Sequence, residues 1–161
     1  MDNDIVFRSA RLTGRSPYSG AAALYAALFG PVRGPARLLI DLQDWGRHAV
    51  APWVLFHAAY PVGVGGFRIG FGGEGLELAF DFLPEVTGQG LASEFVQAAL
   101  DHATFEFQED SFFALVPTGQ AAPMRILQKA GFTEDRMTNG AHLMRLTLRL
   151  GPAVGRRRQA V

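Results

Sequence analysis

The sequence predicts a mixed α/β domain, and three observations lead to this prediction. A chain of 161 residues suits one domain, and 48% hydrophobic with 19% charged residues supplies a core. Segments of helical periodicity lie between segments with strand patterns. Several strand segments follow one another across turn signals typical of antiparallel hairpins, so we expect a mixed sheet.

In the first part of the chain, one strand, two helices and three further strands are expected. An Ala/Leu-rich helix ends at Gly30-Pro31, and the next helix carries Leu38, Leu42 and Trp45 at helical spacing. The later strand segments are rich in aromatic and branched residues or laced with glycine. The expected strands are 9–15, 53–56, 62–71 and 76–82, and the expected helices are 19–29 and 36–50.

The second part of the chain alternates helices and strands. The helix expected at 91–105 has one apolar stripe, and the helix expected at 121–130 ends at Gly131. A strand is expected at 111–116, and two more, at 132–137 and 141–150, flank the hairpin signal Asn139-Gly140. The apolar stripe consists of Leu91, Phe95, Ala99 and Ala103.

Charge and composition exclude several classes of protein. The 15 basic and 15 acidic residues give a net charge of +0, so no overall basic field exists to hold nucleic acid. The absence of cysteine excludes disulfides and thiolate chemistry, and it suits a reducing cytoplasm. No apolar run reaches the roughly 20 residues of a membrane span, and no signal-peptide pattern is present. We expect residues 1–150 to form one domain and residues 151–161, with three consecutive arginines, to form a flexible basic tail.

The segment with the clearest chemistry is a glycine loop between a strand and a helix. Gly88 and Gly90 have no Cβ, so their amides can approach a ligand closely. The helix that starts near Leu91 offers unpaired amides and the positive end of its dipole, which suits a pyrophosphate. A turn of this kind is also a common packing solution. It lacks the lysine of a phosphate-binding Walker loop and the third glycine of the dinucleotide fingerprint.

A second segment about thirty residues further on makes the interpretation more specific. Residues 120–132 read as a turn, a short helix and a Gly-Phe exit. Together with the glycine loop, this segment resembles the GNAT superfamily of acetyl-CoA-dependent N-acetyltransferases. The closer match is the branch that includes ribosomal-protein N-terminal acetyltransferases. The likeness spans roughly residues 9–150 and rests on Arg11-Leu12, Arg15, Glu77-Leu78-Ala79-Phe80, Pro84-Glu85, Gly88-Gln89-Gly90, Ala92 and Glu94.

The resemblance implies a mixed, largely antiparallel central sheet of about seven strands with helices on both faces. The sequence departs from the family pattern at four positions. Glu85 stands where members often carry Gln or Arg, Gln120 replaces an Asn, and Pro123 replaces a Ser. Leu127 occupies the position at which many relatives place a tyrosine that protonates the departing thiolate.

The resemblance also implies a site for acetyl-CoA as co-substrate. The strand before the loop would splay from its neighbour, and the main chain of Phe82 and Leu83 would bind pantetheine and polarise the thioester carbonyl. The main-chain amides of the loop would hold the pyrophosphate, and Gln120 and Pro123 would border the pantetheine arm. The loop residues are Gly88, Gln89, Gly90, Leu91, Ala92 and Ser93.

Two carboxylates are candidates for the general base. Strand alternation places Glu77, Ala79 and Asp81 on one face and the apolar residues between them on the other. The apolar face should pack on core helices, so Glu77 and Asp81 would face the substrate. Glu77 is the first candidate because the branch commonly has Glu there, and the alternative is that Glu77 is a structural hydrogen-bond partner.

The four histidines, His48, His57, His102 and His142, show no metal-ligand spacing, so we predict no metal site. His142 could face the acceptor channel as a base, although a lone strand histidine is more often structural.

The leading prediction is an N-acetyltransferase that moves an acetyl group from acetyl-CoA directly to a primary amine. The acceptor would be a protein N-terminus or a small-molecule amine, and no nucleic acid or membrane partner is expected. A homodimer is plausible because the terminal strands have edges that need cover. The alternatives are a non-catalytic acyl-CoA-binding or interaction module and a plain α/β domain whose glycine loop only packs.

Overall fold

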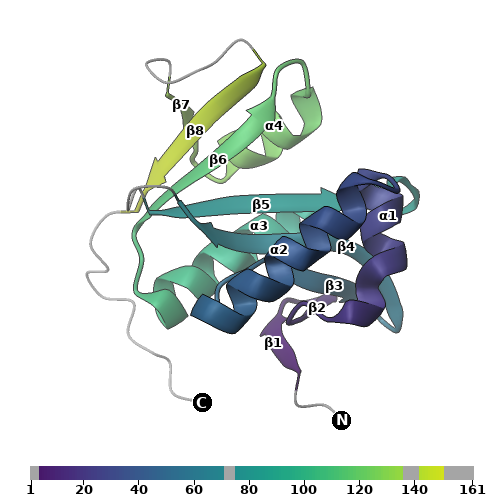
Figure 1. The fold of residues 1–161 in the computed structure, drawn as a ribbon. Coiled ribbons are helices and arrows are strands. Elements are labelled where there is room, and N and C mark those ends of the chain that lie inside the picture. The colour runs from purple at the N-terminus through teal and green to yellow at the C-terminus, as the bar shows by residue number, and fades with distance from the viewer. Residues whose placement is uncertain (1–3, 71–74, 136–141, 151–161) are drawn as a thin grey trace.

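Eight strands form one sheet that runs the length of the molecule (Figure 1). The structure is a computed structural model, and it describes residues 4–70, 75–135 and 142–150. The sheet order is β1-β2-β3-β4-β5-β6-β8-β7, and every neighbouring pair is antiparallel except β5 and β6. The strands are β1 (Ile5–Arg8), β2 (Leu12–Arg15), β3 (Trp53–His57), β4 (Tyr60–Ile69), β5 (Leu76–Phe82), β6 (Ser111–Pro117), β7 (Thr133–Glu134) and β8 (Leu143–Arg149).

Helices cover both faces of the sheet. In Figure 1, α2 crosses in front of β4 and β5, and α3 lies behind them. The helices are α1 (Ala22–Phe29), α2 (Arg33–His48), α3 (Leu91–His102) and α4 (Ala121–Lys129). The expectation of a mixed, largely antiparallel sheet between helices is therefore confirmed, with one strand more than the seven expected.

The sheet separates two hydrophobic clusters. On one face, α3 and α4 pack through Phe95, Ala99 and Leu127 against Leu78 of β5 and Ala114 of β6. On the other face, α1 and α2 form a smaller cluster with β3 and β4. The predicted stripe is buried throughout, because Leu91, Phe95 and Ala99 of α3, and Ala103 just after its end, lie on the face that this helical segment turns to the sheet. The members of the smaller cluster are Ala21, Leu24, Tyr25, Leu38, Val54 and Val64.

The start of the chain differs from the prediction of one strand at 9–15. The structure has a hairpin, in which β1 pairs with β2 and residues 9–11 form the turn. β1 is short and lies beside charged residues, so its pattern in the sequence is weak. Phe7 nevertheless anchors it, because its ring stacks on Trp53 with the centroids 4.7 Å apart.

Several helix boundaries also moved. α2 begins at Arg33 rather than residue 36. Pro35 lies in its first turn, where a backbone N–H has no partner within the helix, so proline is tolerated there. α3 ends at His102, and a short π-helix, Ala103–Phe107, completes the segment expected as helix. The hairpin signal Asn139-Gly140 and the expected tail at 151–161 lie outside the described residues. Within the described part of the chain, no helix has the length and apolar character of a membrane span.

Candidate active site

The central sheet opens between β5 and β6. These parallel strands pair only at Leu76 with Phe112 and at Glu77 with Phe113. β5 continues to Phe82 and β6 to Pro117 with no further pairing between them. The remaining five residues of β5 therefore border a wedge-shaped gap, which is the splay expected from the resemblance.

The register of β4 and β5 decides which main-chain groups face this gap. The Leu83 amide donates to the Val62 carbonyl at 2.9 Å, so it points toward β4. Opposed residues of an antiparallel pair alternate between hydrogen-bonded and non-hydrogen-bonded, so Phe82, paired with Gly63, turns its amide and carbonyl away from β4. The expectation that the Leu83 main chain binds pantetheine was wrong for its amide, because that amide completes the β4–β5 ladder. The same alternation directs the Phe80 main chain into the gap, although Phe80 was not among the predicted cofactor-binding residues.

A cavity of about 300 Å³ lies where the gap meets the start of α3. It collects six of the ten residues predicted to bind the cofactor: Phe82, Gly88, Gly90, Leu91, Ala92 and Ser93. The remaining lining comes from residues that the sequence did not indicate: Val86, Thr87, Ala122 and Ile126. Ala122 and Ile126 are four residues apart on α4, so they share one helix face, and that spacing was the available signal.

The glycine loop leaves room for an anion at the end of α3. Gly88 and Gly90 have φ values of +81° and +77°, a left-handed conformation that favours glycine. A Cβ placed at Gly88 would meet no atom within 4 Å, so the space beside it is open to a ligand. No side chain caps the N-terminus of α3, and its first amides remain available. An uncapped, glycine-lined helix start of this kind fits a pyrophosphate.

Four of the predicted residues lie outside the cavity lining. Gln120 is the N-cap of α4, and Pro123 lies within its first turn. The Gln89 carbonyl accepts a hydrogen bond from Arg11 of the N-terminal hairpin, and the Leu83 carbonyl accepts one from the nearby Val86 amide. Glu85, whose carboxylate would repel a pyrophosphate, is also outside the lining and is exposed, so solvent screens its charge.

Arg11 braces the glycine loop from the N-terminal hairpin. Its Nε forms an ion pair with Glu94 Oε1 at 2.8 Å, and its Nη1 donates to the Gln89 carbonyl at 2.9 Å. Glu94 Oε2 accepts from the Ser9 hydroxyl at 2.6 Å and from the Arg11 amide at 2.8 Å. One carboxylate in the first turn of α3 thus joins the hairpin, the loop and the helix.

We expect Glu94→Gln to lower the free energy of unfolding by about 1 kcal/mol at neutral pH, the scale of a partly exposed charged hydrogen-bond set. Burial raises the pKa of Glu94, but the hydrogen bonds from Ser9 and Arg11 and the Arg11 charge outweigh it and lower the pKa. A lowered carboxyl pKa stabilises the fold above the unfolded-state pKa, and that stability is lost as the pH falls through the folded-state pKa. The difference in unfolding free energy between wild type and Glu94→Gln, measured by urea unfolding, should shrink as the pH falls. A difference that stays constant across pH would contradict the stabilising role given to the Glu94 carboxylate.

Glu77 and Asp81 lie on the face of β5 that is covered by α1 and α2. Their partners on β4 are Arg68 and Val64, and Val64 belongs to the α1/α2 cluster. Burial raises the pKa of the half-buried Glu77 carboxyl, and the charges of Arg68 and Arg37 oppose the rise in part. Asp81 is exposed, and partial loss of solvation also raises its pKa.

Glu77 has no hydrogen-bond or ion-pair partner among the described residues. The alternative that Glu77 is a structural hydrogen-bond partner therefore has no support in the structure. A carboxyl with a raised pKa and no partner is suited to accept a proton.

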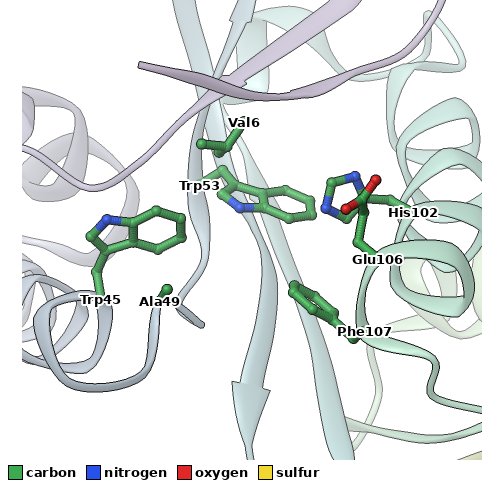
Figure 2. A pocket seen from close by; sticks show the side chains of 7 residues that line it. All are labelled: Val6, Trp45, Ala49, Trp53, His102, Glu106 and Phe107. Atoms are coloured by element: carbon green, nitrogen blue, oxygen red, sulfur yellow. The ribbon is translucent and has the colours of Figure 1, made fainter. Parts of the chain in front are cut away.

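Another cavity, of about 350 Å³, lies at the opposite end of α3 and holds none of the predicted cofactor residues. Figure 2 shows the His102 imidazole beside the Glu106 carboxylate, with the Trp53 indole next to it. Trp53 and His102 meet edge to face with their centroids 5.0 Å apart. Burial lowers the pKa of His102, and the Glu106 charge opposes the effect in part. The full lining is Val6, Trp45, Ala49, Trp53, His102, Glu106 and Phe107.

We expect His102 to weaken the fold in mild acid. Its folded-state pKa is lowered, so the unfolded chain binds a proton at a higher pH than the native protein does, and stability falls as the pH drops through the unfolded-state value near 6.5. His102→Gln should flatten the fall in unfolding free energy between pH 7.5 and pH 5, measured by urea unfolding. An unchanged pH slope would show that His102 is not responsible.

His48, His57 and His142 are not buried, and no group of three potential metal-ligating residues occurs among the residues that the structure describes.

The chain belongs to the acetyltransferase (GNAT) domain family. The family model matches residues 24–133, which is more than half of the chain and includes the splayed strands and the glycine loop. No curated protein matches the chain in sequence.

Solved structures show the same fold at low sequence identity. An acetyltransferase from Agrobacterium tumefaciens str. C58 superposes with a TM-score of 0.76 at 16% identity, over 89% of this chain and 93% of that one. The ribosomal L7/L12 alpha-N-protein acetyltransferase RimL superposes with a TM-score of 0.72 at 15% identity, over 91% of this chain and 94% of that one. The structure of yncA from Salmonella typhimurium, solved with its cofactor acetyl-CoA, superposes with a TM-score of 0.67 at 18% identity, over 92% of this chain and 99% of that one.

Proposed function

We propose that this protein transfers an acetyl group from acetyl-CoA to a primary amine. The observation that carries the proposal is the geometry of β5. One end of the strand borders an uncapped helix start suited to pyrophosphate, and the other end holds the unpartnered carboxyl of Glu77. From Phe82 to Glu77 the strand spans roughly 17 Å, a length that an extended pantetheine arm can follow along the gap.

The cofactor would be held mainly by the main chain. The amides at the start of α3 and the glycine loop would bind the pyrophosphate, as helix starts bind phosphates in general. The Phe82 and Phe80 main chains would hydrogen-bond the pantetheine arm and donate to the thioester carbonyl as negative charge develops on its oxygen. Ala122 and Ile126 of α4 supply an apolar wall. Because main-chain groups do most of this binding, Gln120 and Pro123 are compatible with it.

Glu77 would act as the general base. It takes a proton from the acceptor ammonium, directly or through a water, and the free amine then attacks the thioester carbonyl. A carbon–nitrogen bond forms and the carbon–sulfur bond breaks, so coenzyme A departs as a thiolate. The acylated nitrogen then loses its second proton to solvent to give the neutral amide, and the thiolate is protonated by solvent. Leu127 stands where many relatives have a tyrosine acid, so no side chain at that position protonates the thiolate. A thiolate is a good enough leaving group for this, since ordinary thiols have pKa values near 8.5.

The acceptor is proposed as a class. RimL is a protein N-terminal acetyltransferase by its description, and a Vibrio cholerae spermidine N-acetyltransferase superposes with a TM-score of 0.70 at 15% identity, over 87% of this chain and 94% of that one. Both descriptions name amine acceptors, and the exposed carboxylate of Asp81 suits a cationic amine. We therefore propose a protein N-terminus or a small primary amine.

Isothermal titration with acetyl-CoA and with coenzyme A tests the cofactor site. We expect micromolar binding of both, followed by release of free thiol when a polyamine, an amino acid or a peptide with a free N-terminus is added. Binding without thiol release from any amine would indicate a non-catalytic acyl-CoA-binding module. No binding at all would leave the glycine loop as a packing turn and overturn the proposal.

A further inference from the structure

Asp41 of α2 is the one charged residue that is fully buried in the described part of the chain. Its two carboxylate oxygens have different partners. Oδ1 forms an ion pair with Nη1 of Arg68 at 2.6 Å, and Oδ2 accepts a hydrogen bond from the Tyr25 hydroxyl. Asp41 therefore links helices α1 and α2 to strand β4 beneath them.

The arrangement is energetically demanding. A buried carboxylate loses its hydration, and an ion pair in the interior often stabilises a fold no better than apolar residues of the same size. The Arg68 side chain is 14% exposed and the Asp41 side chain 0%, so solvent screens the pair little. Burial and the adjacent carboxylate raise the pKa of Tyr25, which keeps its hydroxyl protonated as a donor to Asp41.

A second carboxylate, that of Glu77, lies opposite Arg68 in the sheet. Arg68 of β4 is paired with Glu77 of β5 in the strand register, and opposed residues of an antiparallel pair project from the same face of the sheet. Glu77 is thus the carboxylate directly across from Arg68 on the neighbouring strand. The Arg68 guanidinium nevertheless pairs with Asp41, above the sheet, and it makes no ion pair with Glu77.

We propose that Asp41 is a positioning residue: with Tyr25 it holds the Arg68 guanidinium toward α2 and so keeps the Glu77 carboxylate unpaired. This inference rests on the proposed function only in giving Glu77 the role of the base. Its geometric content, that Asp41 withholds Arg68 from Glu77, stands apart from any activity.

The consequence for proton transfer follows from charge. A carboxylate paired with a guanidinium is a weaker base, because the pair lowers a carboxyl pKa by about one to three units. Arg68 and Arg37 are the cations that act on Glu77, and Asp81 and Asp41 are the anions near them. On the β6 side, Glu77 pairs with Phe113, whose ring lies under Arg145 of β8. With Asp41 paired to Arg68, the Asp41 charge offsets much of the effect of Arg68 on Glu77, which is the larger of the two arginine effects.

Removal of the Asp41 charge should release Arg68 to Glu77. Asp41→Asn keeps the size of the side chain and an acceptor for Tyr25, but it loses the ion pair. We expect the Glu77 titration to move down by about one pH unit or more. In the pH profile of kcat/KM, measured with the amine that the acceptor panel identifies, the midpoint of the acid limb should move to lower pH by the same amount. The maximum value of kcat/KM should fall, since a weaker base takes the proton more slowly.

The titration can be read without any substrate. Protein labelled with carbon-13 at the glutamate carboxyls reports each glutamate by NMR, and the Glu77→Gln variant assigns the Glu77 resonance. The double variant Asp41→Asn/Arg68→Gln replaces the pair by neutral groups of similar size. We expect its Glu77 titration to return to within about half a pH unit of wild type, because a clamped Arg68 is already neutralised by Asp41.

Two outcomes overturn the proposal. One is an unshifted Glu77 titration in folded Asp41→Asn. The other is a double variant whose Glu77 titrates more than one pH unit above wild type, which would mean that Arg68 already lowers the Glu77 pKa in the native protein as strongly as a direct ion pair would. The double variant decides the matter by itself if Asp41→Asn does not fold. A shifted titration together with full activity of Glu77→Gln would uphold the clamp and reject Glu77 as the base.

Discussion

Glu77→Gln is expected to lower kcat/KM by about 100-fold or more, the usual scale of losing a general base. Glutamine has nearly the same shape as glutamate and cannot accept the proton. Because Glu77 has no hydrogen-bond or ion-pair partner among the described residues, the substitution breaks no contact that the structure shows, and the fold should persist. Acetyl-CoA binding measured by titration should therefore remain close to wild type while thiol release collapses.

The pH dependence gives this expectation a second signature. Burial raises the pKa of Glu77, so kcat/KM of wild type should fall as the pH drops through a value above the ordinary glutamate pKa near 4.3. That limb should vanish in Glu77→Gln. A second limb, from deprotonation of the acceptor amine itself, belongs to the substrate and should survive in the variant.

Two further variants make the result specific. Glu106→Gln makes the same chemical change at an exposed position in the π-helix that follows α3, and we expect its kcat/KM to stay within about twofold of wild type. Asp81→Asn should lower kcat/KM less than Glu77→Gln does, because Asp81 is exposed and lies nearer the open end of the gap between β5 and β6. If Glu77→Gln turned over acetyl-CoA as wild type does at every pH, the base would have to be sought elsewhere.

The parts of the fold that the sequence predicted well are those that depend on local pattern. The buried stripe of α3 repeats every four residues, and the alternation of β5 places Glu77 and Asp81 on one face whatever surrounds the strand. The glycine loop was predictable for the same reason, since a left-handed turn before a helix requires glycine at defined positions. Each of these features is set by residues within one turn or one strand.

The parts that the sequence could not predict depend on contacts between distant segments. Arg11 and Glu94 are 83 residues apart, and nothing in either neighbourhood indicates that one braces the other. Asp41 looks like a polar residue on the wet side of an amphipathic helix, yet it is fully buried because Arg68 arrives from β4 and Tyr25 from α1. The direction of the Leu83 amide follows from the register with Val62, which the chain's own pattern does not specify.

Gly88→Glu is expected to weaken acetyl-CoA binding by about 100-fold or more. Gly88 has a φ of +81°, so any side chain there strains the backbone by about 1–2 kcal/mol. The new carboxylate would also project into the open space beside the helix start, where the pyrophosphate is proposed to bind. Repulsion between like charges and loss of the space then act together on the same ligand.

Gly30 offers a matched control for this substitution. Its φ is +91° and its ψ 168°, a conformation that also favours glycine, and a Cβ there meets no atom within 4 Å, so Gly30→Glu introduces backbone strain and the same charge at the end of α1. We expect Gly30→Glu to lose at least as much stability as Gly88→Glu in thermal unfolding, while only Gly88→Glu loses the heat of acetyl-CoA binding. Equal loss of binding in the two variants would assign the effect to general destabilisation. If Gly88→Glu bound acetyl-CoA with wild-type affinity, the pyrophosphate could not bind at the glycine loop. The proposed path of the pantetheine arm along β5 toward Glu77 would then also be wrong.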